Sequence, residues 1–202
     1  AASDVYKRQV HTLEDGVLAH ILTAIHDRRM ITYENKSSRS NAVSTHTCVP
    51  LKILVSTQTG RRYLCLYHPE LRRFSNARLD SIQKVVSGEP YEAYSKVLSD
   101  LEQNQGKCWG VSFGNGRNRL QEVCIKLRID EEKEPYILNR LYREGRGGQV
   151  MKIRENEYLY SGMFFDTNEM LSWIKTFTGR ILDIQGCLLY TSPSPRDRSL
   201  SR

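Results

Sequence analysis

The 202-residue sequence lacks the features that mark several large protein classes. It has no run of about 18 uninterrupted apolar residues, so we expect no membrane-spanning helix. It does not begin with a basic segment followed by an apolar one, as a secretory signal would. Its five cysteines are too few for a disulfide framework in a chain of this length, and they favour the reducing environment of the cytoplasm.

Motifs for metal binding and catalysis are missing as well. The cysteines form no Cys-x-x-Cys pair and the five histidines have no ligand-like spacing, so we expect no metal site and no cofactor. There is no Gly-x-Ser-x-Gly, Walker A, Gly-x-Gly-x-x-Gly or His-Glu-x-x-His motif. Gly145–Gly148 follows a predicted helix, so we expect it to end that helix rather than to bind phosphate. An enzyme is therefore not expected.

The two ends of the chain differ in composition from the rest. Residues 1–9 and 187–202 resemble translated sequencing-adapter sequence, and we expect both to be extraneous to the fold. A genuine disordered basic tail is the alternative for residues 187–202, which are rich in Ser, Pro and Arg. The net charge is +7, of which the first nine residues carry +1 and the last sixteen +2, leaving +4 on Val10–Gly186. That charge permits anion binding without requiring it.

The first half of the chain predicts one helix followed by short strands. Glu14–Arg29 has apolar residues at helical spacing, namely Val17, Leu18, Ile21, Leu22 and Ile25. Strands are expected at Met30–Glu34, Thr45–Thr57, Arg62–His68, Leu71–Ser75 and Arg78–Val86, the last with a bulge. Ser87–Pro90 is expected to break the chain. Short strands joined by tight turns favour a small β-barrel.

The second half predicts strands and helices in alternation. Strands are expected at Glu122–Ile129, Gln149–Arg154, Tyr158–Phe165 and Arg180–Ile184, with helices at Pro135–Arg143 and after Asp166–Glu169. The order β-α-β-β-α-β is typical of a ferredoxin-like domain. The sequence therefore predicts an α+β protein: a barrel domain over residues 10–88, a linker helix and loop over 89–118, and a ferredoxin-like domain over 119–186.

Arginine and aromatic residues gather in the segment Gly60–Ile82. Arginine binds phosphate through two N–H groups at once, and aromatic rings stack on bases. If these side chains converge on one face of a barrel, the composition favours binding of a nucleotide or a nucleic acid. The alternative is that the arginines are separate, solvated side chains on edge strands and the tyrosines are half-buried.

The same segment resembles the core of the WYL domain, a family found in bacterial transcriptional regulators. The family has a Trp-Tyr-Leu run, then a His or aromatic residue, then Phe followed by Arg-Leu-Asp-Arg-Ile. Here the corresponding residues are Arg62-Tyr63-Leu64, Tyr67-His68, Phe74 and Arg78-Leu79-Asp80-Ser81-Ile82. Arg62 replaces the family's Trp, and Ser81 replaces its second Arg, which removes one expected cation.

The resemblance extends along most of the chain. Ile31-Thr32-Tyr33 and Val49-Pro50-Leu51 resemble earlier strands of the domain. The second half resembles the C-terminal extension that often follows a WYL domain, and Phe164–Gly179, with Glu169 and Trp173, fits the end of that extension.

The resemblance implies an Sm/SH3-like barrel that senses a nucleotide or a short single-stranded nucleic acid within a cytoplasmic, dimeric regulator. The ligand contacts it implies are Tyr63, Tyr67, His68, Arg72, Arg73 and Arg78, with Tyr33 and Lys52 as further candidates. Operator DNA would be bound by a winged helix-turn-helix domain expected before Val10. The alternatives are a nucleic-acid- or protein-binding accessory module outside transcription, for example in phage defence, and a purely structural interaction domain.

Overall fold

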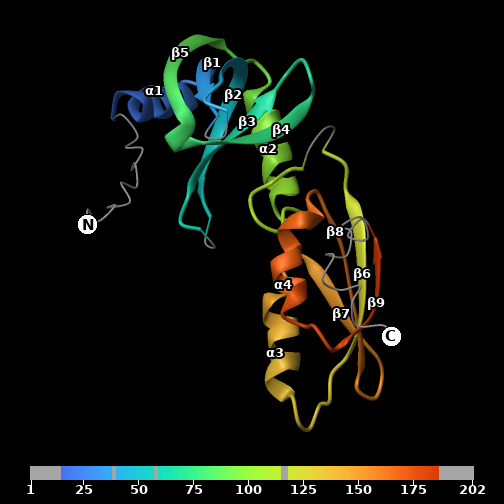
Figure 1. Ribbon diagram of the computed structural model, residues 1–202. Helices are drawn as coiled ribbons and strands as arrows, with labels where there is room; N and C mark the ends of the chain where they lie inside the picture. The colour runs from blue at the N-terminus through green and yellow to red at the C-terminus, as the bar shows by residue number, and fades with distance from the viewer. Residues whose placement is uncertain (1–14, 38–39, 57–58, 115–117, 187–202) are drawn as a thin grey trace, which may run out of the picture. The chain divides into compact units, whose positions relative to one another are not determined.

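The computed structural model describes residues 15–37, 40–56, 59–114 and 118–186; both segments expected to be extraneous lie outside these ranges. Over the described residues the chain is α+β, with two antiparallel sheets and four α-helices (Figure 1). It divides into two compact units, residues 1–101 and 102–202. The division falls within α2 (Tyr94–Gln105), in the stretch that the sequence assigns to the linker. No described helix has the length and apolar character needed to cross a bilayer.

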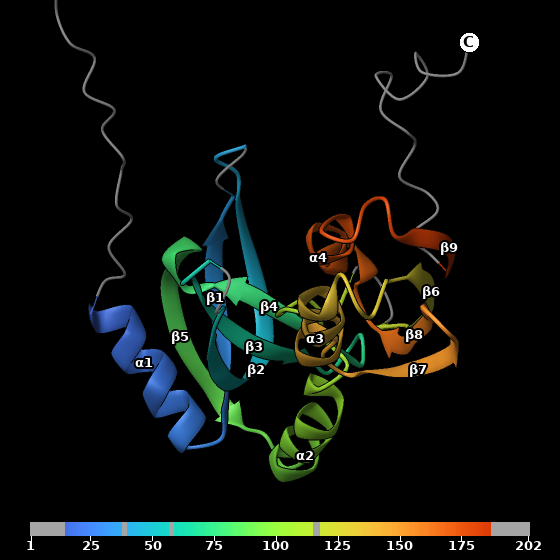
Figure 2. The ribbon, with the colours of Figure 1, turned by 90° about the horizontal axis from the view of Figure 1, so that it is seen from below.

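The first unit is a five-stranded sheet preceded by α1 (Asp15–His26). Its strands are β1 (Arg29–Lys36), β2 (Val43–Val55), β3 (Arg62–His68), β4 (Arg73–Arg78) and β5 (Ile82–Pro90), in the order β4-β3-β2-β1-β5. Helix α1 packs beside β5 and β1 (Figure 2) and buries Val17, Ile21 and Ala24. Leu22 was expected on the buried face but is 50% exposed, because one residue of helix turns the side chain about 100° away from Ile21.

The hairpin between β3 and β4 differs from the sequence expectation. The strand predicted from Leu71 begins at Arg73, because Pro69–Arg72 forms the turn. The Arg72 amide donates to the Pro69 carbonyl, and Arg72 adopts a positive φ of 47°. The turn thus takes up two residues that the apolar pattern assigned to the strand.

The predicted bulged strand Arg78–Val86 begins too early. β4 ends at Arg78, and the 3₁₀ turn Leu79–Ser81 redirects the chain before β5 begins at Ile82. The expected bulge is present within β5, where the register with β1 shifts: the neighbours Glu34 and Asn35 pair with Lys84 and Ile82, and Gln83 is passed over. The turn and this irregularity together account for the uneven spacing of the buried residues. The break expected at Ser87–Pro90 is also wrong, since these residues continue β5 and pair with β1, with Pro90 opposite Arg29.

The second unit contains a four-stranded antiparallel sheet with its helices following two of the strands. The strands are β6 (Gln121–Arg128), β7 (Gly148–Arg154), β8 (Glu157–Phe164) and β9 (Ile181–Gly186), in the order β7-β8-β6-β9. α3 (Pro135–Glu144) follows β6, and the 3₁₀ turn Thr167–Met170 with α4 (Leu171–Lys175) follows β8. Proline at the first position of α3 starts the helix as predicted, because its missing N–H has no helical partner there.

Glu169 in the 3₁₀ turn before α4 and Trp173 in α4 both contact the segment Trp109–Ser112. Glu169 accepts hydrogen bonds from the backbone amides of Gly110, Val111 and Ser112, at 3.0–3.3 Å. Trp173 packs against Trp109, with ring centroids 4.7 Å apart, and both rings belong to the core cluster. The chain contains two tryptophans, so its tryptophan fluorescence reports on this unit alone.

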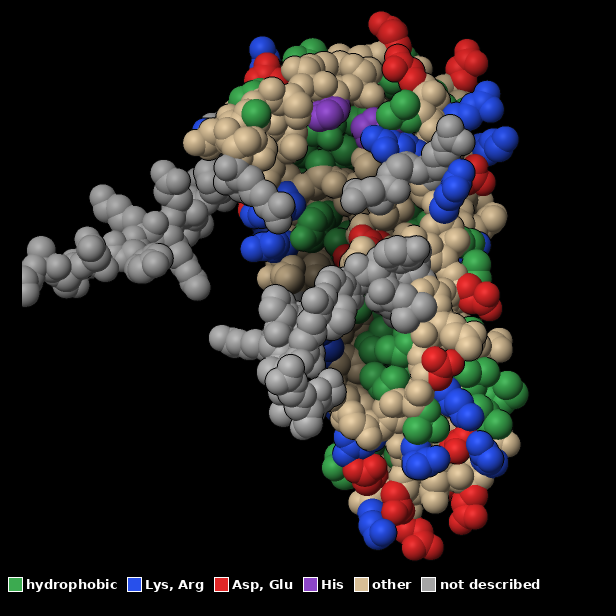
Figure 3. Space-filling model, turned by 45° about the vertical axis from the view of Figure 1, so that its right-hand side comes forward, with side chains coloured by type: hydrophobic (Ala, Val, Ile, Leu, Met, Phe, Trp, Pro, Cys, Tyr) green, Lys and Arg blue, Asp and Glu red, His purple; other side chains and the backbone are tan. Residues whose placement is uncertain are grey.

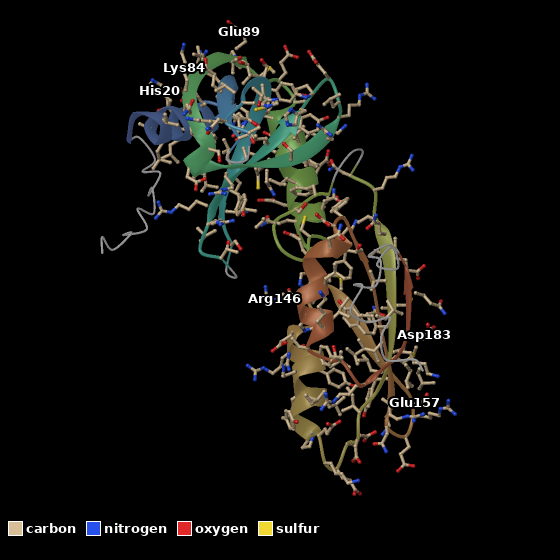
Figure 4. All side chains as sticks on the ribbon, in the orientation of Figure 1. His20, Lys84, Glu89, Arg146, Glu157 and Asp183 are labelled. Carbon is tan, nitrogen blue, oxygen red and sulfur yellow. The ribbon has the colours of Figure 1, made fainter. Side chains whose placement is uncertain are left out.

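A buried carboxylate holds one end of the second sheet. Glu157 is 5% exposed and forms ion pairs with Lys126 at 3.0 Å, Arg154 at 2.9 Å and Arg128 at 3.4 Å. These cations come from the two strands that flank β8, so the cluster ties β6, β8 and β7 together at Glu157, which Figure 4 labels. The Lys126 and Arg154 side chains lower the pKa of Glu157 to about 2.

Glu157→Gln is predicted to destabilise the second unit in a pH-dependent way. The pKa of Glu157 lies below its ordinary value of 4.5 in the folded chain. The stabilisation that its charge gives the folded state is therefore complete above about pH 4.5 and is lost as the pH falls toward 2. The difference in urea midpoint between wild type and variant, followed by tryptophan fluorescence, should be clear at about pH 7 and shrink by about pH 3. Glu132→Gln, an exposed change in a nearby loop, is the control; a pH-independent difference for Glu157→Gln would contradict the assignment.

Candidate functional site

Strand β3 divides the predicted ligand contacts between two faces of the sheet. Side chains along a strand alternate between faces, and directly opposite residues on paired strands share a face. Tyr63 lies opposite Arg78 and Tyr67 opposite Phe74, whereas His68 lies opposite Arg73. The predicted residues therefore do not gather on a single face. Tyr63, Tyr67 and Arg78 share one side, and His68 and Arg73 share the other.

The His68 side carries a continuous set of rings, which we call the imidazole row: Tyr33, His46 and His68. The rings of Tyr33 and His46 have centroids 5.4 Å apart, and those of His46 and His68 are 6.5 Å apart and nearly perpendicular. His68 Nε2 lies 2.7 Å from Ser75 Oγ on β4. Figure 3 shows histidine side chains beside hydrophobic ones on the surface of the first unit. The row thus brings together β1, β2 and β3 next to Arg73.

His46 belongs to this row, although the sequence analysis did not select it. It lies directly opposite Tyr33 in the β1–β2 ladder, and it is two residues from Cys48, which is buried in the core of this unit. Alternation along the predicted strand Thr45–Thr57 would have placed His46 on the same face as Cys48. The signal was therefore present in the sequence, but only a known register connects His46 to His68.

Burial sets the protonation states within the imidazole row. The pKa of His68 is lowered by burial, and further by the nearby charges of Arg73 and His46. The pKa of Tyr33 is raised, chiefly because the side chain is only 5% exposed. At neutral pH His68 is therefore uncharged and Tyr33 keeps its proton. Of the predicted ligand contacts beside the imidazole row, Arg73 is therefore the one that carries a charge.

The opposite face, which we call the tyrosine face, carries Tyr63, Tyr67 and Arg78. The Tyr67 ring contacts Phe74 at 5.3 Å and Tyr91 at 6.4 Å between centroids. Arg78 makes a bidentate ion pair with Asp80, donating from Nε and Nη2 to the two carboxylate oxygens. These hydrogen bonds raise the pKa of the guanidinium. The charge of Arg78 is therefore already compensated within the fold.

Arg72 and Lys52, the remaining predicted contacts, are both exposed. Arg72 lies in the turn before β4, and its charge opposes the effect of burial on the pKa of Tyr67. Lys52 lies where the β2–β3 register shifts, opposite Cys65. Lys52 therefore shares a face with Cys65 rather than with His68, and Arg72 lies in the turn outside the β3–β4 ladder.

The cysteines of the first unit have a structural explanation. Cys48 and Cys65 are fully buried, and burial raises the pKa of each thiol to about 12. Within the described ranges, no three His, Cys, Asp or Glu side chains come together as metal ligands. These thiols therefore act as small apolar side chains.

Comparison with known proteins gives a likeness of fold. No family model matches the chain. No curated protein sequence matches it either. A solved structure described as a CRISPR Cas-related protein aligns with a TM-score of 0.51 and 11% identity, over 83% of this chain and 46% of that one. Proteasome accessory factor B/C (PafBC) of Arthrobacter aurescens aligns with a TM-score of 0.38 and 15% identity, over 92% of this chain and 25% of that one.

The coverage and the sequence identity of these two alignments decide what each of them shows. The chain spans less than half the length of either structure. The first likeness, at 11% identity, shows the fold alone, and the second is too low in TM-score to add to it.

The structure predicts how His68 titrates. Its pKa should lie below 6.5, and Arg73→Gln should raise it, because that change removes a neighbouring positive charge. Arg72→Gln removes the same charge one residue earlier, from the turn, where the charge acts on Tyr67, and should leave the pKa of His68 in place. An NMR titration of the imidazole Hε1 signals measures both effects. Equal responses to the two changes would contradict the assigned geometry.

Proposed function

We propose that the first unit binds a nucleotide or a short single-stranded nucleic acid through the imidazole row. The observation that carries this proposal is the contiguity of Tyr33, His46 and His68 beside Arg73. Proteins that bind single strands combine rings on which bases stack with cations that meet the backbone. Tyr33 is 5% exposed and supports His46 from the core side, whereas His46 and His68 are only partly buried and are the rings that can meet a base.

The fold supports a barrel of the Sm/SH3 type that the WYL resemblance implies. The sheet order β4-β3-β2-β1-β5, the leading helix α1 and the 3₁₀ turn before β5 all agree with that interpretation. In the second unit, the order β7-β8-β6-β9 with helices after β6 and β8 supports the ferredoxin-like interpretation.

We further propose that ligand binding on this unit regulates a larger protein. In the WYL setting that protein is a dimeric, cytoplasmic transcriptional regulator, and the ligand changes operator affinity by favouring one of two arrangements. The likeness in fold to a CRISPR Cas-related protein supports a second candidate role, in which the same surface binds the ligand within a defence-associated module.

The proposal is for binding without catalysis. The contact of His68 with Ser75 at 2.7 Å has the reach that a general base and a nucleophile need. Among the described hydrogen bonds, however, none joins His68 to a carboxylate that would orient the ring. We therefore assign the Ser75 hydroxyl the role of fixing the His68 ring for ligand contact.

The matched pair Arg73→Gln and Arg72→Gln tests where a nucleic acid binds. Both changes remove one positive charge, but Arg73 lies opposite His68 and Arg72 in the preceding turn. Binding of fluorescein-labelled single-stranded DNA and RNA of about eight nucleotides is measured by anisotropy at two salt concentrations. Arg73→Gln should weaken binding and lower the salt slope by about 0.7, the value for one phosphate contact on a single strand. Arg72→Gln should change neither.

His46→Ala tests stacking separately from charge. Losing one stacked ring costs about 1–3 kcal/mol, so binding should weaken about tenfold, with an unchanged salt slope. Circular dichroism confirms that each variant is folded. Equal weakening by Arg72→Gln and Arg73→Gln would mean attraction by charge alone and would reject the row as the site. Weakening by Arg72→Gln alone would move the site to the turn before β4.

A further inference from the structure

A hollow of about 260 Å³ on the second unit is lined by Arg140, Arg143, Glu144 and Arg146. Arg140, Arg143 and Glu144 lie on one side of α3, because residues three and four apart are neighbours on a helix. Arg146 follows in the turn after α3, and Figure 4 marks its place near the end of that helix. Three of the four lining residues are arginines.

Arg140 is held in one position by the fold. Its Nε and Nη2 atoms donate to the Glu144 carboxylate at 3.3 Å, and Nη2 also donates to Thr176 Oγ1 at 2.8 Å. Its guanidinium carbon lies 5.3 Å from the centre of the Phe177 ring. A cation fixed in this way loses little side-chain entropy when it binds an anion.

Glu144 also has its hydrogen bonds within the protein. Besides the Arg140 contacts, it accepts a hydrogen bond from the Trp173 indole at 3.2 Å. Its charge compensates that of Arg140, which leaves Arg143 and Arg146 as the charges in excess at the hollow. Both are exposed, and no ion pair to either occurs among the described residues. The hollow therefore carries an excess of two positive charges.

The size and charge of the hollow specify the class of ligand. The helix dipole favours a cation in the last turn of a helix, so it explains the placement of Arg143 without any ligand. Arg146 lies beyond the end of the helix, so the dipole does not explain its placement. The volume is below the roughly 300–1,000 Å³ of sites that enclose a whole drug-sized ligand, so the hollow suits a single charged group.

We propose that this hollow binds a phosphate monoester, either of a small phosphorylated compound or of the 5′ end of a nucleic acid. A phosphate monoester carries a charge of about −1.5 to −2 at pH 7, which matches the excess charge, and arginine binds its oxygens in pairs. This site belongs to the second unit and is independent of the imidazole row in the first.

The intact chain provides its own reporter for this site. Trp173 bonds to Glu144, so its fluorescence should respond when an anion binds beside Arg140. The probes are inorganic phosphate, adenosine 5′-monophosphate, and a four-nucleotide single-stranded DNA with and without a 5′-phosphate. We expect a saturable response to phosphate-monoester probes that strengthens between about pH 5 and pH 7.5, because the second pKa of a phosphate monoester is near 6. Sulfate, which does not titrate in this range, is the control for pH effects on the protein.

The double variant Arg143→Gln/Arg146→Gln should weaken monoester binding at least about tenfold. Both side chains are exposed, so the fold should be retained, and the unliganded fluorescence spectrum checks this. Arg119→Gln/Lys133→Gln removes two charges from exposed side chains of the same unit that do not line the hollow, and it should bind as wild type does.

Each outcome of the titrations decides between stated alternatives. A response to inorganic phosphate and adenosine monophosphate supports a small-compound site, and a response restricted to the 5′-phosphorylated DNA supports an end-binding site. Measurable binding of both DNAs with equal affinity, equal weakening by both double variants, or no response to any probe would overturn the proposal. If the imidazole row binds no nucleic acid, the phosphate titrations still stand, because the variants that test the row and those that test the hollow lie in different units.

Discussion

Strand β2 is the element on which the first unit depends, because it belongs to two ladders. Residues Val43–Cys48 pair with β1, and Val49–Val55 pair with β3, so one continuous strand connects the two halves of the sheet. The register shifts between Pro50 and Lys52. A proline is tolerated inside a strand at such an irregularity, since it has no N–H to donate. The Tyr94 hydroxyl donates to the Pro50 carbonyl at 3.0 Å, which anchors the start of α2 to this point.

This arrangement also creates the candidate site. β2 carries His46 in its ladder with β1 and pairs with β3 farther along. It therefore brings the ring centroid of His46 to 6.5 Å from that of His68, although the two residues are far apart in sequence. Tyr33 enters the row only because β1 pairs with the first half of β2. A one-residue slip in either ladder would turn these rings to the opposite face.

Much of the fold was predictable where local pattern decides it. The bounds of β3 were predicted correctly, and α3 differs by a single residue, because β alternation and an early proline are local signals. Two strands were predicted in this stretch, but the break between them was placed before Arg78 instead of at Leu79–Ser81, since a 3₁₀ turn with buried Leu79 resembles part of a strand in sequence. The extension of β5 through Gly88 and Pro90 depends on pairing with β1, which no local pattern records.

The site was less predictable than the fold for a physical reason. Clustering along the sequence does not distinguish the two faces of a strand, so Tyr67 and His68 were grouped although they are neighbours on opposite faces. The pairing of Arg78 with Asp80 removes a cation that composition counts as available. The excess charge at Arg143 and Arg146 could not be inferred either, because it depends on which arginine Glu144 compensates.

Two carboxylates show how the second unit controls its positive charge. Glu157 is surrounded by three cations and serves to join strands, whereas Glu144 is bound to a single arginine and to the Trp173 indole. The first arrangement places its cations around a buried acid, where they lower its pKa and stabilise the sheet. The second uses an acid to fix one cation at the edge of a hollow whose other arginines stay uncompensated.

The charge distribution also constrains what the imidazole row recognises. Burial and the neighbouring charge of Arg73 keep His68 neutral at pH 7, so the row presents rings rather than a row of cations. A polyanion would find little charge there beyond Arg73, because Arg78 is compensated, Arg72 lies in the turn before β4 and Lys52 lies opposite Cys65. The geometry therefore favours a ligand whose base contacts outweigh its phosphate contacts. For such a ligand, salt should affect affinity less than the loss of a ring does.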